Sequence, residues 1–301
     1  MSSSDLTWVD GRAAGLPSRA WAYVELTKPR IALFELMAVA VGATLGATVP
    51  TDGAFLLHLL LGTALVAGGA SALNQWMERA IDARMARTVS RPLPSGRLTS
   101  REVFWFAVAA SLTGVVYLSL AVSWVSAAVA AASWFLYVAA YTPLKSRTVL
   151  NTVVGAVAGA LPFAIGWSAV GGPFNLVAVT SFTIIYLWQF PHFMAIAWLY
   201  REEYAAAGLV MWPSLDPAGT RAARLAVLAA LCLLPVGLLP VTLGLESDYY
   251  LTGAVTLSVM YIAAAGAFFI RRNESSARTL LRMSLVYLPS LFGLMTLVRV
   301  A

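Results

Sequence analysis

The sequence predicts an all-α integral membrane protein with nine transmembrane helices, its N-terminus inside and its C-terminus outside (N-in/C-out). Of its 301 residues, 60% are hydrophobic and 11% are charged, whereas soluble domains carry about 25% charged residues. Long apolar runs recur along the whole chain, which excludes a soluble domain held by one anchor. Basic residues also gather on alternate loops, and this pattern sets the orientation.

Nine apolar segments are each long enough to cross about 30 Å of hydrocarbon. Gly, Ala and Ser are frequent within them, which permits close helix packing. We expect a single domain over 1–301, opened by a polar segment, 1–27, that lacks the apolar core of a signal peptide. The expected spans are 30–49, 54–77, 102–121, 123–141, 149–170, 174–200, 222–244, 249–270 and 279–298.

The charge distribution supports this number of spans. With the N-terminus in the cytoplasm, 19 of the 20 Lys and Arg residues fall on the cytoplasmic side, and only Arg299 lies outside. The opposite loops carry Asp52, Glu246 and Asp248 and no Lys or Arg. The net charge of +6 therefore reflects membrane orientation, and we expect a lipid bilayer and no nucleic acid as partner.

Two long cytoplasmic loops, 78–101 and 201–221, both open with acidic residues at the membrane boundary. These are Glu78 and Asp82 in the first loop and Glu202 and Glu203 in the second. Two such helix ends, four spans apart, suggest facing halves of one cavity.

The first motif places Asn74, Glu78 and Asp82 four residues apart, so they share one helix face. Carboxylate and amide oxygens at this spacing can hold a hard cation. Arg87 and Arg91 follow and can neutralise a departing diphosphate. Because Pro92 cannot continue a helix, we expect this helix to end near Ser90.

The alternative for this motif is a polar helix end in which Asp82 pairs with Arg79. It leaves Glu78 unexplained, because the residue four positions on is Asp82 rather than a cation. Carboxylates four apart repel each other unless a cation lies between them.

The second motif runs from Tyr141 to Thr152. Its Lys145 and Arg147 can bind a diphosphate or another acidic group, or they can simply belong to a basic cytoplasmic loop. Asn151 and Thr152 enter a span, where polar groups need partners.

The third motif reads Trp188-Gln-Phe-Pro-His192-Phe. A histidine inside a membrane span indicates function by default, and the alternative is a packed histidine bonded to a neighbouring helix. Aromatic faces such as that of Trp188 can stabilise a carbocation, although aromatic clusters in spans are more often packing. Glu35, buried in the first span, either pairs with Arg30 or reaches the cavity.

Together these residues resemble the UbiA superfamily of intramembrane prenyltransferases and, within it, the heme O synthases. The likeness covers nearly the whole chain. The first motif indicates only the superfamily, whereas the block around His192 and the later tyrosine-to-glycine block carry the specific resemblance. The quoted motifs are Leu26-Thr-Lys-Pro-Arg30, Asn74-x3-Glu78-x3-Asp82, Arg87-Thr88, Arg91-Pro92-Leu93, Tyr141-Thr-x-Leu-Lys145, Gly166-Trp167, Trp188-Gln-x-Pro-His192-Phe and Glu203-Tyr204-x2-Ala-Gly208.

The resemblance implies nine helices around a central cavity that opens to the cytoplasm of the cell (inner) membrane. It implies farnesyl transfer from farnesyl diphosphate to a vinyl group of heme B, followed by water capture, with Mg²⁺ as cofactor. It also implies contact with heme A synthase or cytochrome oxidase assembly. The implied metal ligands are Asn74, Glu78, Asp82 and Glu203; the catalytic residues are Asp82, Arg87, Arg91 and His192; and the binding residues are Tyr141, Lys145, Arg147, Asn151 and Trp188.

This chain departs from the superfamily in its second acidic cluster. Adjacent Glu202 and Glu203 stand where many members have aspartates four apart, and adjacent side chains diverge by about 100° on a helix. A second Mg²⁺ is therefore not expected from this pair, and Glu203 is the better candidate ligand. Two further hypotheses are a prenyltransferase for an aromatic acid or quinone precursor, and a membrane transporter. Polar residues clustered at one membrane face argue against the transporter.

Overall fold

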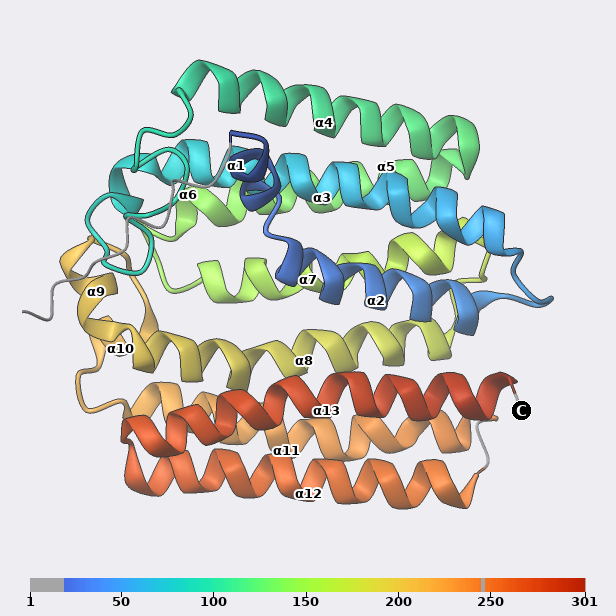
Figure 1. Cartoon of the computed structure of the whole chain (residues 1–301). Coiled ribbons are helices and arrows are strands. Elements are labelled where there is room, and N and C mark those ends of the chain that lie inside the picture. The colour runs from blue at the N-terminus through green and yellow to red at the C-terminus, as the bar shows by residue number, and fades with distance from the viewer. Residues whose placement is uncertain (1–18, 245–246, 301) are drawn as a thin grey trace, which may run out of the picture.

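The chain folds into a bundle of long helices that run side by side (Figure 1). The computed structural model describes residues 19–244 and 247–300. Within these residues nine helical segments are long and apolar enough to cross a membrane, as the sequence predicts. They are α2 (Pro29–Gly46), α3 (Gly53–Asp82), α4 (Ser100–Ala121), the continuous α5 (Trp124–Phe135), η1 (Leu136–Tyr141) and α6 (Thr142–Leu144), then α7 (Asn151–Ala169), α8 (Leu176–Leu199), α11 (Thr220–Thr242), α12 (Asp248–Arg271) and α13 (Glu274–Val300).

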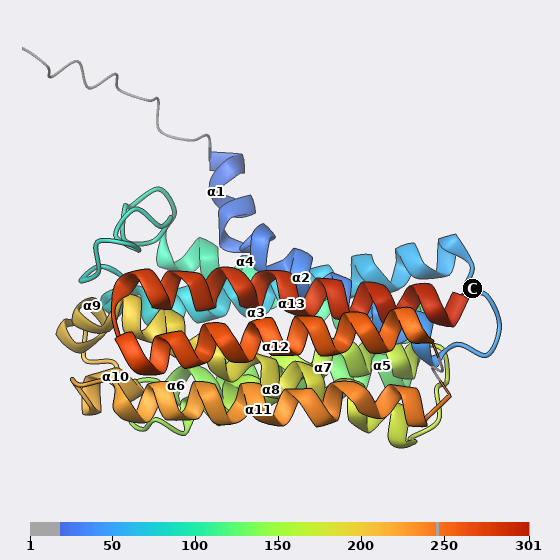
Figure 2. The same ribbon diagram turned by 90° about the horizontal axis from the view of Figure 1, so that it is seen from below.

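The three remaining helices are short: α1 (Arg19–Leu26), α9 (Arg201–Ala206) and α10 (Trp212–Leu215). Helix α1 projects from one side of the bundle (Figure 2). Helices α9 and α10 lie at the same end of the bundle as α6 and the connection after α3 (Figure 1). The two predicted cytoplasmic loops thus meet at one end. The N-in/C-out orientation stays a prediction, and Arg12 and Glu246 of the charge count lie outside the described residues.

Helices α7 and α8 occupy the middle of the bundle. Helix α7 packs against α2, α5 and α8, while α8 also packs against α11 and α13. On the outer sides, α4 covers α3, and α12 packs against both α11 and α13. The α7–α8 pair therefore connects the N-terminal helices to the C-terminal ones.

Glycines allow α2 and α7 to approach closely. A Cβ atom on Gly42 would lie 2.1 Å from the carbonyl oxygen of Phe163, and one on Gly166 would lie 1.9 Å from that of Val39. Neither position tolerates a side chain without moving a helix backbone. Small residues at helix crossings are the expected device in membrane bundles.

The helix that carries the first motif was predicted to end near Ser90, and this is wrong, because α3 ends at Asp82. The hydroxyl of Thr88 donates to the carbonyl oxygen of Asp82 at 2.8 Å. In a longer helix this carbonyl would accept from a backbone N–H of the next turn, so the hydroxyl caps the helix end. The chain then folds back through turns until α4 begins at Ser100. This return brings residues 87 and 91 to the end of α3.

Candidate functional site

The three predicted oxygen ligands on α3 lie side by side in one polar cavity. Asn74, Glu78 and Asp82 are 1%, 8% and 1% exposed, and all three line the cavity. Their burial follows from the helix period, which turns every fourth residue to the same side. Around them stand four cationic residues, contributed by the start of α2, the connection after α3 and the end of α6: Lys28, Arg87, Arg91 and Lys145.

Each of the three oxygen groups contacts a cation. The contacts are Lys28 Nζ to Asn74 Oδ1 at 2.9 Å, Lys145 Nζ to Glu78 Oε1 at 2.8 Å, and Arg91 Nη1 to Asp82 Oδ2 at 2.7 Å. The alternative in which Asp82 pairs with Arg79 is therefore wrong. Arg79 instead donates to the carbonyl of Trp76 at 2.7 Å and lies over its ring.

Lys28 enters the cavity through an unusual backbone conformation. Its φ of 49° and ψ of 62° are left-handed, which costs a non-glycine residue about 1–2 kcal/mol. Pro29 is the first residue of α2, and its fixed φ angle already suits a helix, so α2 begins directly after Lys28. Burial, assisted by the like charges of Arg91 and Lys145, lowers the pKa of Lys28 to about 7.

The pKa of Lys145 shifts in the opposite direction from that of Lys28. Burial opposes its charged form, but the adjacent Glu78 carboxylate together with Tyr141 and Tyr137 more than offsets burial and raises the pKa of Lys145 above its ordinary value. The ammonium also lies 4.7 Å from the ring centre of Tyr141. Lys145 therefore stays cationic in the cavity.

Arg87 links the two loops that the sequence predicts to be cytoplasmic. Its backbone N–H donates to Glu203 at 3.3 Å, and its guanidinium donates to the Tyr204 hydroxyl at 3.4 Å. The guanidinium also lies 4.8 Å from the ring centre of Tyr200. Glu202 is highly exposed and pairs with its neighbour Arg201, so the two acids diverge as expected.

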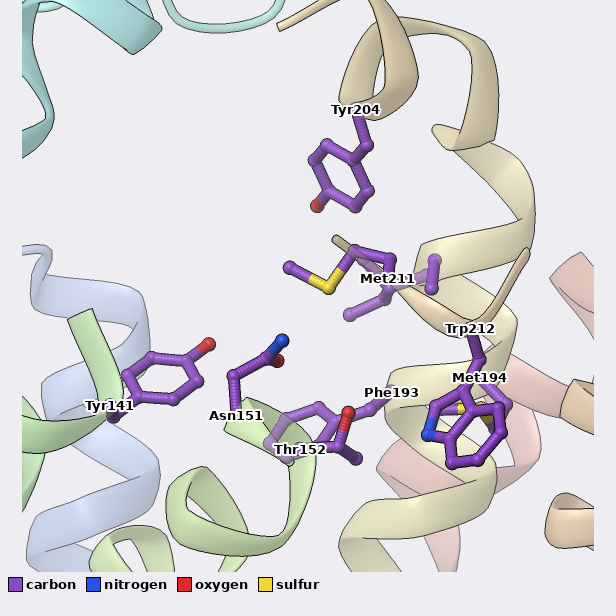
Figure 3. A pocket seen from close by; sticks show the side chains of 10 residues that line it. Tyr141, Asn151, Thr152, Phe193, Met194, Tyr204, Met211 and Trp212 are labelled. Carbon is purple, nitrogen blue, oxygen red and sulfur yellow. The ribbon is translucent and has the colours of Figure 1, made fainter. Parts of the chain in front are cut away.

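A second, mostly apolar cavity adjoins the polar cavity and shares Tyr141, Tyr204 and Met211 with it. The hydroxyls of Tyr141 and Tyr204 point into the space between them, and Met211 lies across that space (Figure 3). Phe193, Trp212 and other apolar side chains complete the lining. A ligand can therefore place a charged head in the polar cavity and an apolar tail or ring in the adjoining apolar cavity.

Asn151 lines the apolar cavity and also fixes its wall. Its side-chain amide donates to the carbonyls of Thr148, at 2.6 Å, and Val210, at 2.9 Å. The backbone N–H of Val210 in turn donates to the carbonyl of Lys145 at 2.7 Å. These bonds position the chain around Met211 beside the start of α7.

Four predicted site residues line neither cavity, and one of them is the predicted metal ligand Glu203, which accepts from the backbone N–H of Arg87. Nδ1 of His192 is 2.8 Å from the Ser284 hydroxyl of α13, and its ring stacks on Trp188 with centres 5.1 Å apart. Trp188 is buried and donates to the Ser284 carbonyl at 2.7 Å. Arg147 is exposed. The roles predicted for these four residues remain predictions.

Sequence reasoning missed part of the cavity wall. It gave no site role to Lys28, Tyr204 or Met211, although all three line the polar cavity. It also missed the π-helical turn η1, in which Tyr137 and Tyr141 stack with ring centres 5.5 Å apart. Such wide turns are frequent at functional sites, but the run Leu136–Tyr141 carries no sequence signal for one.

The residues on α3 fit a hard divalent cation. They offer one amide and two carboxylate groups, and Mg²⁺ in proteins is commonly held by one or two carboxylates together with substrate phosphates. Oε1 of Glu78 is buried and makes no hydrogen bond of favourable geometry, although it lies near Lys145. Within the described residues no group of three or more His, Cys, Asp or Glu residues gathers, so substrate or water oxygens must complete such a site.

The chain is similar in sequence to curated farnesyltransferases over nearly its whole length. It matches the UbiA prenyltransferase family over residues 36–286. It is 42% identical to the protoheme IX farnesyltransferase of Solibacter usitatus, covering 92% of this chain and 98% of the relative. It is 39% identical to that of Myxococcus xanthus, covering 97% and 99%.

Solved structures share the fold at low sequence identity. A digeranylgeranylglyceryl phosphate synthase superposes with a TM-score of 0.74 at 17% identity, covering 94% of this chain and 99% of that one. A UbiA homolog from Archaeoglobus fulgidus, bound to GPP and Mg²⁺, gives a TM-score of 0.64 at 18% identity, covering 91% and 99%.

Proposed function

The chain belongs to the UbiA prenyltransferase family, and we propose that it transfers a farnesyl group from farnesyl diphosphate to a vinyl group of heme B. Addition of water completes the product, heme O. The observation that carries this proposal is the identity of 39–42% to protoheme IX farnesyltransferases over more than nine-tenths of the chain. The paired polar and apolar cavities agree with a phosphorylated, amphiphilic donor.

The diphosphate group of the donor binds in the polar cavity. Arg91 and Lys145 already point at carboxylates there, and both can turn to phosphate oxygens as these enter. Arg87, held between two tyrosine rings, presents a third cation from the connection after α3. Fixed cations aimed at the developing charge of a leaving group lower the barrier to its departure.

Asn74, Glu78 and Asp82 would hold a Mg²⁺ ion against the diphosphate, and Glu203 is the candidate for a further ligand. The ion, when bound, neutralises charge on the diphosphate as it leaves. Because Glu202 and Glu203 diverge, they do not offer a second ion a shared pair of carboxylates. Arg87 and Arg91 instead supply the positive charge that a second ion would bring to the diphosphate.

The farnesyl chain and the porphyrin face the apolar cavity. Tyr141 and Tyr204 stand at the boundary between the two cavities, where the bond to diphosphate breaks. The π face of Tyr141 can stabilise the allylic cation that remains. The hypothesis for His192 and Trp188 is that they position heme from the adjoining part of α8.

The protein acts in the cell (inner) membrane with the polar cavity facing the cytoplasm. The distribution of Lys and Arg supports this orientation. A C-terminal alkaline phosphatase fusion should be active, and a C-terminal green fluorescent protein fusion should be dark. The reverse result would contradict the orientation. Heme A synthase and cytochrome oxidase assembly remain the proposed partners downstream.

The decisive experiment offers the purified protein farnesyl diphosphate, Mg²⁺ and either heme B or 4-hydroxybenzoate, with products identified by mass spectrometry. Formation of heme O from heme B supports the proposal. Prenylation of the benzoate and not of heme would instead establish the aromatic-acid alternative. The transporter hypothesis gains no support, because the family to which the chain belongs consists of prenyltransferases.

A further inference from the structure

Thr142 contacts one of the candidate metal ligands from outside the polar cavity. It is the first residue of α6, which packs against α3, and its side chain is buried without lining either cavity. The side-chain nitrogen Nδ2 of Asn74 donates to the Thr142 hydroxyl at 3.1 Å. Because Asn74 lines the polar cavity and is itself buried, this hydrogen bond connects the wall of the cavity to the helix behind it.

The hydroxyl of Thr142 can only accept in this contact. Its single proton is donated to the carbonyl oxygen of Tyr137 at 2.8 Å. That carbonyl lies five residues back rather than the usual three or four, because the wide turn η1 ends at this point. The backbone N–H of Thr142 donates to the same carbonyl. The lone pairs of the hydroxyl therefore need a donor from α3, and the amide of Asn74 supplies it.

The two partners of the Asn74 amide determine which way it faces. Nζ of Lys28, 2.9 Å from Oδ1, can only donate, so the amide oxygen faces the cavity. Thr142 accepts, so the amide nitrogen faces away from the cavity. An amide turned by half a rotation would oppose two donors at Lys28 and two acceptors at Thr142, whose proton is already engaged.

This orientation matters because a hard divalent cation binds the oxygen of an amide. A Mg²⁺ ion at Oδ1 would repel the ammonium of Lys28, so the hydrogen bond from Lys28 cannot hold the amide once the ion is present. The bond to Thr142 is on the nitrogen side and is compatible with the ion. Hydrogen bonds behind a metal ligand orient it, and their loss typically costs about 10–100-fold in metal affinity.

We propose that Thr142 is a positioning residue that holds the amide of Asn74 with its oxygen toward the metal ion. The inference rests on the proposed function, in which Asn74 is a Mg²⁺ ligand. It also gives a purpose to the wide turn η1, which ends in a hydroxyl whose proton is engaged within its own helix and whose lone pairs are free for α3.

The experiment compares purified wild type with T142V, which keeps the shape of the side chain without the hydroxyl, and with T142S, which keeps the hydroxyl. Melting temperature in detergent is followed as Mg²⁺ is added at a fixed concentration of inorganic diphosphate, so the readout needs no turnover. We expect T142V to raise the half-saturating Mg²⁺ concentration at least about tenfold and T142S to stay within about twofold of wild type.

T63V is the matched control, and it should keep the half-saturating Mg²⁺ concentration of wild type. Thr63 is also buried and lies on α3, but its hydroxyl donates to the carbonyl of Leu59 in its own helix. A general effect of removing a buried threonine hydroxyl would appear in T63V as well.

The variant N74D tests whether Thr142 acts through the amide. A carboxylate has two equivalent oxygens, so it offers an oxygen to the cavity whichever way it is turned. In the N74D background we therefore expect T142V to change the half-saturating Mg²⁺ concentration by less than about twofold, which is the coupling that a double-mutant cycle measures.

Three results would overturn the assignment. T142V with the Mg²⁺ dependence of wild type would show that the amide is oriented without Thr142, by Lys28 or by Glu78, with which it also interacts. T142S as weak as T142V would show that the hydroxyl is not the group that matters. An equally large effect of T142V in N74D would show that Thr142 does not act through the amide.

Failure of the proposed function is seen in wild type before any variant is compared. Wild type without a Mg²⁺-dependent shift in melting temperature would contradict the metal site, and this inference with it. Wild type that shows the shift but does not farnesylate heme B would contradict the proposed acceptor alone, and the comparison with T142V would still decide the role of Thr142.

Discussion

The contact between Asp82 and Arg91 allows a sharp test of the metal site. Nη1 of Arg91 donates to both carboxylate oxygens of Asp82, at 2.8 and 2.7 Å. The Asp82 side chain is 1% exposed and that of Arg91 is 22% exposed. Replacing Asp82 by Asn keeps the shape of the side chain but removes the charge that holds Arg91 and, by our proposal, the metal.

The expected loss of stability follows from this geometry. A hydrogen bond to a charged group contributes about 1.5–3 kcal/mol, and removing one partner of a fully buried ion pair costs about 3–5 kcal/mol. Because water reaches a fifth of Arg91, we expect D82N to lower the free energy of unfolding by about 2–3 kcal/mol. The protein should remain folded in detergent.

Activity separates the two roles of Asp82. If Asp82 holds Mg²⁺, D82N should lower kcat/KM by at least about a hundredfold and raise the Mg²⁺ concentration needed for half-maximal rate. R91Q, the control that breaks the same contact from the other side, should weaken diphosphate binding while leaving that Mg²⁺ concentration unchanged. Initial rates over a Mg²⁺ series and thermal melting measure both effects. An unchanged Mg²⁺ dependence in D82N would show that Asp82 serves only to hold Arg91.

Three further predictions concern other parts of the structure. Lys145→Met should raise the KM for farnesyl diphosphate at least about tenfold, because one charged hydrogen bond contributes about 1.5–3 kcal/mol; an unchanged KM would remove Lys145 from the diphosphate site. Gly166→Ala should destabilise the protein by about 1–3 kcal/mol through overpacking, whereas Gly266→Ala, where an added Cβ meets nothing within 4 Å, should be neutral or stabilising; equal melting temperatures would contradict the helix contact. His192→Ala should lower the rate of heme O formation without changing the Mg²⁺ dependence, and unaltered kinetics would assign His192 to packing with Ser284.

The sequence alone determined the membrane architecture and the chemistry of one helix face. Nine spans were predicted and nine are found in the described residues, with most ends shifted by one to five residues. Hydropathy and helix period are properties of neighbouring residues, so they can be recognised along one stretch of chain. For the same reason the shared face of Asn74, Glu78 and Asp82 was predicted correctly.

Only the tertiary structure decided which groups meet on that face. Asp82 pairs with Arg91 rather than Arg79 because α3 ends early and the chain folds back. Lys28, 46 residues before Asn74, reaches it through a left-handed backbone, and His192 turns to Ser284 and away from the cavities. Such contacts depend on loop paths and helix packing between segments far apart in the chain, and local sequence patterns carry no information about either.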